Sequence, residues 1–545
     1  MSRHRFDAEE TMSLTSGRKS SIHEAMNGDG GGGGGAYPLG QHTAKRLDSF
    51  VRRIDSLLST GIAVVLLLLL CASWIEPPNY RATRKISSRY DACHLDVHGL
   101  VQRFDLSSRF HYSRNFVVPS TRDRELDPTL AFGRFDPHPR QIRAQLAQKF
   151  DELDSNSLAT ARLSTCSVSN IVDVPFFPPH HSTRTQGKNI MVGYATNTAR
   201  IRKWTPMLQH SFAHTGLHLV LQLPGNEDGV DLARDLNALG IRTSIIHDDA
   251  EYRIRWARLP MVLYPLADRN TQWIMVSDDD SFVLSLPRIL AVLDKYDPRQ
   301  HHFVGTLSDK WANMVFGPES FGGGGTFLSL PLVKHLLPHW EAYAQREWLI
   351  GGDQRMSWCV FENSYARLSW EPTVLTQNDA EGDIQGLIES GQRFGTFHHL
   401  SWRERQHNET LFAFAAQACG SSRSECLFQR FLLPENRASP SSSSTRFMLT
   451  HGWSIVRYPT AHLPDFGRTE LTWEHAPQDY WSHGMGPLRD KVEERTRETK
   501  PDRPWKESWL LAEVKLAEGS EPARHTYVKR GGADGLDSVI ELVWL

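Results

Sequence analysis

Apolar runs alternate with helical segments in the middle of the chain, and this alternation constrains the fold more than any other feature. Apolar residues at helical spacing run from Asp228 to Leu239 and stop at Gly240, a typical helix end. A second helix is expected over residues 252–268, interrupted near Pro260 and Pro265. Buried strands are predicted at residues 189–194, 218–223, 241–246 and 273–277. Alternating strands and helices predict an α/β fold with a mostly parallel central sheet and helices on both faces.

The last of these runs leads directly into three acidic residues, Asp278, Asp279 and Asp280. In open parallel sheets, ligands bind beyond the carboxyl ends of the strands. Carboxylates forced together repel one another, and a divalent cation relieves that repulsion. A solvated acidic turn is the alternative. A cation held by few carboxylates keeps positions free for substrate phosphates, so the motif points towards nucleotide-sugar chemistry.

A glycine run follows at residues 321–329, where Gly322, Gly323 and Gly324 precede a fourth glycine and then Phe327. Glycines allow a ligand to approach the backbone closely. The run lacks the Gly-Lys-Ser/Thr ending of a phosphate-binding loop. We interpret these glycines as the wall of a sugar or acceptor pocket, and a plain flexible loop is the alternative.

Two further motifs contain side chains that can act in proton transfer or bind a metal ion. Asp353 follows Gly352 at the start of a predicted helix, where an Asp is commonly an N-cap but can also be a general base. His398 and His399 follow a possible strand. Such histidine pairs are often structural, although a neutral imidazole can complete a cation site begun by a carboxylate.

The N-terminal part predicts a membrane anchor. Residues 56–75 carry no charge and are largely aliphatic, and about 20 such residues span a bilayer as a helix. A signal peptide is the alternative, but the segment lies far from Met1. Residues 1–55, which contain a glycine tract, are predicted to be a disordered cytosolic tail. Basic residues flank the segment equally on both sides, so they do not set its orientation.

Two features favour a lumenal C-terminal part. Asn408 begins an Asn-Glu-Thr glycosylation acceptor. Five of the six cysteines follow the hydrophobic segment, and Cys419 and Cys426 are close enough for a short disulfide loop. The chain is therefore predicted to be a single-pass type II protein with its C-terminal part in an oxidising lumen.

Length and charge bound the remaining possibilities. A chain of 545 residues is too long for one ordinary domain. We expect a partly structured stem over residues 76–185, a catalytic domain over residues 186–405 and a strand-rich accessory region over residues 406–545. The 61 basic and 63 acidic residues give a net charge of −2, which argues against a nucleic-acid partner.

Taken in order, the motifs resemble those of the Fringe-like glycosyltransferases, an inverting β-1,3-glycosyltransferase group with the GT-A fold. The resemblance rests on residues 273–282, 321–329, Asp353 and the histidine pair, and covers roughly residues 185–460. Further segments are similar to the fungal and plant branch of Fringe-related proteins, at residues 378–387, 419–430 and 452–459.

The resemblance implies a role for each motif. Asp280 would bind Mn²⁺ or another divalent cation, with His398 as a second ligand and His399 as its alternate. Asp278 or Asp279 would lie near the ribose or sugar of a UDP-sugar donor. Asp353 would be the catalytic base, although Gly352 replaces the first acid of the family's acid pair.

This resemblance predicts a transferase of the Golgi or endoplasmic reticulum that glycosylates a glycan or glycoprotein. Two alternatives remain at this stage. The chain could be a glycan-binding protein with the same fold and no turnover. It could also be a metal-dependent phosphohydrolase, although two-metal hydrolases usually need more scattered His and Asp ligands.

Overall fold

The structure is a computed structural model. It describes residues 93–120, 139–142, 150–164, 166, 171–176, 187–310, 313, 315, 317–372, 374–379, 383–400, 409–420, 425–433, 445–471, 488–500, 502–519 and 521–545. The chain divides into two units, Met1–Glu76 and Pro77–Leu545, and all described residues belong to the second. The predicted tail and the predicted membrane helix over residues 56–75 lie outside the described residues. Within the described ranges, no helix is long and apolar enough to cross a membrane.

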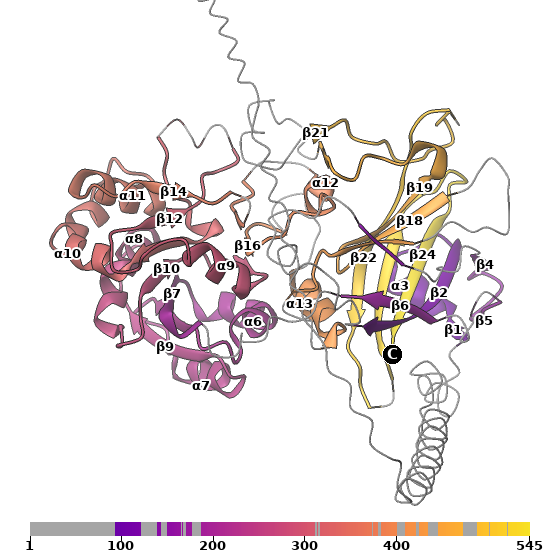
Figure 1. Cartoon of the computed structure of the whole chain (residues 1–545). Coiled ribbons are helices and arrows are strands. Elements are labelled where there is room, and N and C mark those ends of the chain that lie inside the picture. Colours follow the sequence, from indigo (N-terminus) through magenta and orange to yellow (C-terminus); the bar gives the residue numbers. More distant parts are fainter. Residues whose placement is uncertain are drawn as a thin grey trace, which may run out of the picture. The chain divides into compact units, whose positions relative to one another are not determined.

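A seven-stranded sheet forms the centre of the α/β part, in the order β14-β12-β13-β10-β7-β8-β9 (Figure 1). The strands are β7 (Ile190–Ala195), β8 (His218–Leu223), β9 (Arg242–His247), β10 (Trp273–Val276), β12 (Phe303–Gly305), β13 (Thr326–Ser329) and β14 (Leu368–Trp370). Strands β9, β8, β7 and β10 are parallel, whereas β13 runs antiparallel to β10 and β12. The predicted mixed α/β fold with a mostly parallel sheet is confirmed.

Helices cover both faces of this sheet, because alternate side chains of each strand point to opposite faces. On β7, Val192 and Tyr194 pack with one group of helices, and Met191 packs with the other. The first group is α6 (Thr198–Phe212), α7 (Val230–Ala238) and α9 (Leu286–Leu293). The second group is α8 (Tyr252–Leu263), α10 (Leu330–Ala344) and α11 (Gly352–Asn363). Each face therefore carries its own hydrophobic core.

Helix α8 corrects one prediction. It runs unbroken through Pro260 to Leu263, and only Pro265 falls in a following 3₁₀ turn, η2 (Tyr264–Leu266). A proline inside a helix costs about 3 kcal/mol. The side chains of Leu259 and Leu263 are fully buried against the sheet. Each such burial contributes about 2 kcal/mol. Tertiary packing therefore outweighs the local penalty at Pro260.

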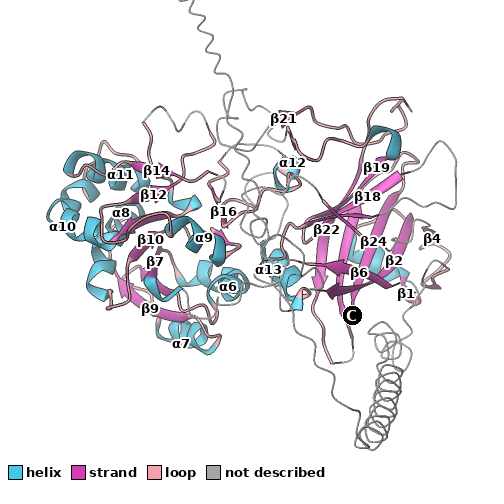
Figure 2. Ribbon diagram, viewed as in Figure 1, coloured by secondary structure: helices cyan, strands magenta, loops and turns pink. Residues whose placement is uncertain are grey.

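A second, ten-stranded sheet joins the two ends of the described chain. Its order is β3-β17-β18-β19-β22-β23-β24-β2-β4, with β6 also paired to β2. Strand β2 pairs parallel with β24 from Phe110 to Val117, so residues of the predicted stem and of the predicted accessory region share one sheet. Its strands are β2 (Arg109–Ser120), β3 (Arg140–Gln141), β4 (Asp151–Asp154), β6 (Ile171–Pro175), β17 (Arg430–Leu433), β18 (Thr445–Thr450), β19 (Ser454–Pro459), β22 (Glu507–Lys515), β23 (Ala523–Lys529) and β24 (Asp537–Trp544) (Figure 2).

Shorter elements complete the described chain. Helices α3 (Val97–Phe104), α12 (Gln385–Ile388) and α13 (Glu409–Gln417) accompany the strands β1 (His94–Asp96), β5 (Thr160–Arg162), β11 (Phe282–Val283), β15 (Leu375–Thr376), β16 (Thr396–Phe397), β20 (Thr469–Glu470) and β21 (Leu488–Arg489). Two disulfides close loops, Cys93–Cys166 and Cys419–Cys426. The second is the pair that the sequence predicted, and the first was not foreseen.

Candidate active site

Strand pairing brings the acidic motif to the histidine pair. Strand β11 begins two residues after Asp280, β16 ends immediately before His398, and the two strands pair antiparallel. As a result, Asp280 Oδ1 lies 3.0 Å from His398 Nε2. One ligand atom from each of Asp280, His398 and His399 lies within 4.8 Å of the others. Mixed carboxylate and imidazole ligands of this kind suit Mn²⁺ and similar divalent ions, so the residues predicted as metal ligands fit the ion.

The other two aspartates face protein partners. Arg200, in the first turn of α6, donates from Nε to both carboxylate oxygens of Asp279 at 2.9 and 2.7 Å, and Thr196 Oγ1 donates to the same carboxylate. Arg200 also lies 3.5 Å from Asp280 Oδ2. Asp278 accepts a hydrogen bond from Trp256 Nε1 at 2.7 Å. Asp279 thus holds Arg200 beside the cluster, and donor contact by Asp278 or Asp279 stays a prediction.

Burial and neighbouring charges shift the pKa values of Asp278, Asp280 and His398 in different directions. Burial raises the pKa of Asp278 to about 6. For Asp280 burial acts in the same direction, but the charge of His398 and its hydrogen bond outweigh burial and hold the pKa below its ordinary value. Burial would lower the pKa of His398, yet Asp280 outweighs it and raises that pKa to about 9. His398 is therefore protonated at neutral pH, and a divalent cation binding there would displace this proton.

His399 lies against His398 in a backbone conformation that is unusual for a residue with a side chain. Its φ is 53°, and the two imidazole rings stack with centroids 3.4 Å apart. Its Nδ1 lies 3.3 Å from Asp379 Oδ1. Burial, and then the neighbouring charge of His398, lower the pKa of His399. It is thus the more readily neutral imidazole of the pair.

The predicted glycine wall lies between His398 and Asp353. Gly322–Gly324 form a 3₁₀ turn, η4, directly before β13. A Cβ atom on Gly323 would lie 2.1 Å from His398 Nδ1, and a Cβ on Gly322 would lie 2.1 Å from the Trp256 ring. The Gly323 carbonyl accepts from Ser281 Oγ at 2.7 Å. Glycine is required here because the backbone touches the side chains of the site.

Asp353 lies on the other side of this turn, in the first turn of α11. The N-cap of α11 is Gly351, and Asp353 instead accepts a hydrogen bond from Gly322 N at 2.6 Å. The N-cap alternative is therefore wrong for Asp353. Burial, and then the charge of Asp278, raise the pKa of Asp353 well above its ordinary value. A carboxylate with a raised pKa is a stronger base, which suits proton abstraction.

Three residues of the site carried no sequence motif: Arg200, Trp256 as the partner of Asp278, and Glu319. Glu319 is buried three residues before Gly322, and its Oε1 accepts from Trp358 Nε1 at 3.3 Å. Burial raises the pKa of Glu319 to about 7. Each residue is recognisable only once the fold brings it to the aspartates or to Asp353.

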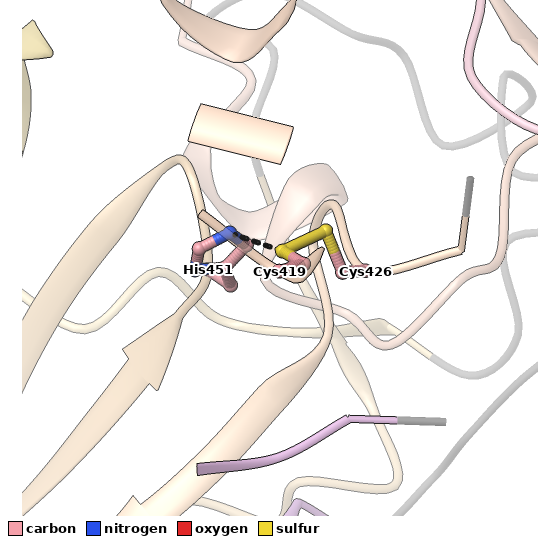
Figure 3. Close-up of side chains that lie close together, drawn as sticks. All are labelled: Cys419, Cys426 and His451. Atoms are coloured by element: carbon pink, nitrogen blue, oxygen red, sulfur yellow. Dashed lines mark hydrogen bonds between the residues drawn. A yellow bond between two sulfur atoms is a disulfide. The ribbon is translucent and has the colours of Figure 1, made fainter. Parts of the chain in front are cut away.

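Two predicted positions lie elsewhere. Asn408 is outside the described residues. Cys419 and Cys426 form a disulfide whose Cys419 sulfur lies 3.0 Å from His451 Nε2 (Figure 3). These three side chains are close enough to hold a metal, but the disulfide uses both thiolates. They form a buried structural cluster apart from the predicted metal ligands.

Comparison with known proteins supports the family resemblance. Residues 250–349 match the family model described as Fringe-like. This stretch includes the acidic motif and the glycine turn. A search of curated proteins finds no match. Over these residues the chain is similar to Fringe-like domains, and this match supports a glycosyltransferase.

Several solved structures, among them a glycosyltransferase and a mannosyltransferase, are similar at low scores. GlyE of Streptococcus pneumoniae TIGR4 is 12% identical, over 32% of this chain and 44% of its own, with a TM-score of 0.24. The mannosyltransferase PcManGT of Pyrobaculum calidifontis, solved with GDP-Man and Mn²⁺, is 12% identical over 45% and 65%, with a TM-score of 0.26. TarS of S. aureus is 9% identical over 43% and 40%, with a TM-score of 0.26. This chain thus spans under two thirds of each of these proteins.

Proposed function

We propose that the chain is a divalent-cation-dependent glycosyltransferase of the GT-A type. It transfers a sugar from a UDP-sugar to a hydroxyl of a glycan or glycoprotein, with inversion and a β-1,3 linkage. One observation carries the proposal: the Asp280–His398 pair and Asp353 flank the same glycine turn, at the carboxyl end of a buried strand. This arrangement separates a phosphate-binding side from a proton-accepting side.

On the first side, Asp280, His398 and His399 would hold the cation. When bound, it would neutralise the charge that develops on the departing diphosphate. Arg200 adds a fixed positive charge, since it lies 3.5 Å from Asp280 and is held by Asp279. A guanidinium in this position is suited to a phosphate or to a donor hydroxyl.

On the second side, Asp353 accepts the proton of the acceptor hydroxyl. The acceptor oxygen forms a bond to the anomeric carbon while the bond from that carbon to the diphosphate oxygen breaks. Attack from the face opposite the leaving group inverts the anomeric configuration, and no covalent enzyme intermediate is formed. The Gly322 N–H fixes one oxygen of Asp353, which leaves the other oxygen for the proton.

We also infer a secretory-pathway membrane protein, in the Golgi or the endoplasmic reticulum. The uncharged segment at residues 56–75 supports an anchor. Two disulfides in the part that follows support an oxidising compartment for that part. Protease protection of the C-terminal part in sealed microsomes would test this topology, and digestion of that part without detergent would contradict it.

The proposed reaction can be tested with a panel of UDP-sugars and Mn²⁺. We expect one donor to release UDP, and proton NMR to show that the first sugar product has the opposite anomeric configuration. Retention of configuration would contradict the role of Asp353 as a base. Absence of UDP release from every donor, by folded protein with Mn²⁺ bound, would favour a glycan-binding protein instead.

A further inference from the structure

A large aromatic side chain is exposed five residues before Asp353 in the sequence. Trp348 lies in the segment between α10 and α11 and is 60% exposed. The next residue, Leu349, is fully buried, and Ile350 is 59% exposed. Two apolar side chains therefore face outwards on either side of an anchoring leucine. Tryptophan is enriched among the residues that dominate binding surfaces, because it offers a large apolar face and a hydrogen-bond donor.

Hydrogen bonds with α11 fix the backbone of the segment between α10 and α11. The buried guanidinium of Arg355 donates from Nε to the Leu349 carbonyl at 2.9 Å and from a terminal nitrogen to the Ala344 carbonyl at 2.8 Å. The Ile350 N–H donates to Gln354 Oε1 at 2.7 Å. Because these bonds fix the backbone, Trp348 is presented by a preorganised support, which lowers the entropy cost of binding.

A chain of contacts links Trp348 to the base. Its ring packs edge-on against Trp358, with centroids 5.3 Å apart and planes at 80°. Trp358 donates to Glu319, which precedes Gly322 by three residues, and Gly322 donates to Asp353. Ile350 lies three residues before Asp353 in the sequence. Trp348 is thus connected to Asp353 through Trp358, Glu319 and the glycine turn, and no link of this chain of contacts is a predicted metal ligand.

Polar groups border the exposed indole. Arg253 donates to the Ile350 carbonyl at 3.4 Å, and its side chain is 53% exposed. The Arg346 guanidinium lies 5.9 Å from the Trp348 ring centroid and donates one hydrogen bond to Glu362 Oε2 at 3.1 Å. A flat apolar ring beside hydrogen-bond donors matches a pyranose, which has an apolar C–H face and a rim of hydroxyls. A lipid would need a larger unbroken apolar patch.

We infer that Trp348 is an acceptor-binding residue, which stacks on a pyranose ring of a glycan acceptor while Arg253 and Arg346 donate hydrogen bonds to the hydroxyls at its rim. This inference rests on the proposed function. It extends that function by naming the residue that recognises the acceptor and by identifying the acceptor as a sugar.

The test compares Trp348→Ala and Trp348→Phe with the wild type, using the preferred UDP-sugar, Mn²⁺ and a panel of p-nitrophenyl mono- and disaccharides as acceptors. We expect Trp348→Ala to raise the acceptor KM about tenfold, the loss expected for one aromatic stacking contact. The donor KM should change less than about twofold, because the donor binds on the cation side. Trp348→Phe should recover most of the acceptor affinity.

Tyr365→Ala is the matched control, because Tyr365 is a fully exposed aromatic residue beyond the end of α11. It should leave both KM values unchanged. An unchanged acceptor KM in Trp348→Ala would overturn the inference while the proposed function stands. UDP release by the wild type without transfer to any glycoside would also overturn it. Absence of UDP release from every donor would instead contradict the proposed function itself.

Discussion

Asp280 and His398 are 118 residues apart, and their side chains meet only because β11 and β16 pair. The sequence predicted both residues as metal ligands from their type and from a family resemblance. It could not predict that Arg200 would hold Asp279, because no local pattern links a helix N-terminus to a strand end 79 residues later. The sequence therefore identified the acidic and imidazole groups, whereas the Arg200 guanidinium beside them could be recognised only in the folded structure.

Asp353→Asn tests the role of Asp353 as the catalytic base. An amide cannot accept the acceptor proton, so kcat should fall about 10²- to 10⁴-fold, the usual contribution of a general base. Mn²⁺ affinity should be retained, because Asp353 lies across the glycine turn from Asp280. Steady-state kinetics and Mn²⁺ titration would measure both. Asp231→Asn, at an exposed acid of α7, is the control. Full transfer by Asp353→Asn would show that another group is the base.

Gly323→Ala tests the close approach of the backbone to His398. The added Cβ would lie 2.1 Å from His398 Nδ1, so the ring must move away from Asp280. We expect loss of about 1–3 kcal/mol of stability by overpacking, and weaker Mn²⁺ binding. Gly351→Ala is the matched control, since a Cβ there meets nothing closer than 4.0 Å. Urea unfolding and Mn²⁺ titration would measure the effects, and equal behaviour of the two variants would contradict this reading of the turn.

At the scale of elements, the α/β sheet was the more predictable part. Its strands are adjacent to the helices that cover them, so the local alternation of apolar runs contains the information. Strands β2 and β24 pair across most of the chain. Tyr112 of β2 donates a hydrogen bond to Glu541 of β24, 429 residues later. The sequence predicted a partly structured stem over residues 76–185 and a strand-rich region over residues 406–545. Which strands pair depends on a register that no local pattern specifies.

Two buried histidines make the ten-stranded sheet sensitive to acid: His525 lies in β23, and His451 lies in the turn between β18 and β19. Neither ring nitrogen of His525 has a hydrogen-bond partner among the residues that the structure describes. Burial, and then the neighbouring His451, lower the pKa of His525 far below 6.5. Burial lowers the pKa of His451 to about 3. Both rings are therefore neutral in the folded protein at pH 7.

Stability should consequently fall as the pH drops below 6.5. Below that pH the unfolded chain binds protons that the folded sheet excludes, so unfolding becomes easier until the folded pKa is reached. The protonation of His451 alone should lower the free energy of unfolding by about 2 kcal/mol between pH 6.5 and pH 5. Urea unfolding at both pH values would show this. His525→Phe should flatten the pH dependence, and His339→Phe, at an exposed position of α10, should not. A flat profile for the wild type would contradict the account.

At the scale of the whole molecule, the two disulfides close loops of very different length. Cys93–Cys166 spans 73 residues, and Cys419–Cys426 spans 7. Chain entropy in the unfolded state predicts that loss of the longer loop costs about 4 kcal/mol and loss of the shorter about 2 kcal/mol. Replacing each pair by two alanines and measuring urea unfolding tests this order. A larger loss for the short loop would show that strain or packing dominates instead.

The proposed cation site can be tested by measuring UDP release from the preferred UDP-sugar. The wild type should release UDP with Mn²⁺ and lose that activity with a chelator. Asp280→Asn should reduce UDP release at least about 10²-fold, because an amide is a weak ligand for the ion that stabilises the leaving group. Asp231→Asn should match the wild type. Undiminished, Mn²⁺-dependent release by Asp280→Asn would contradict the account.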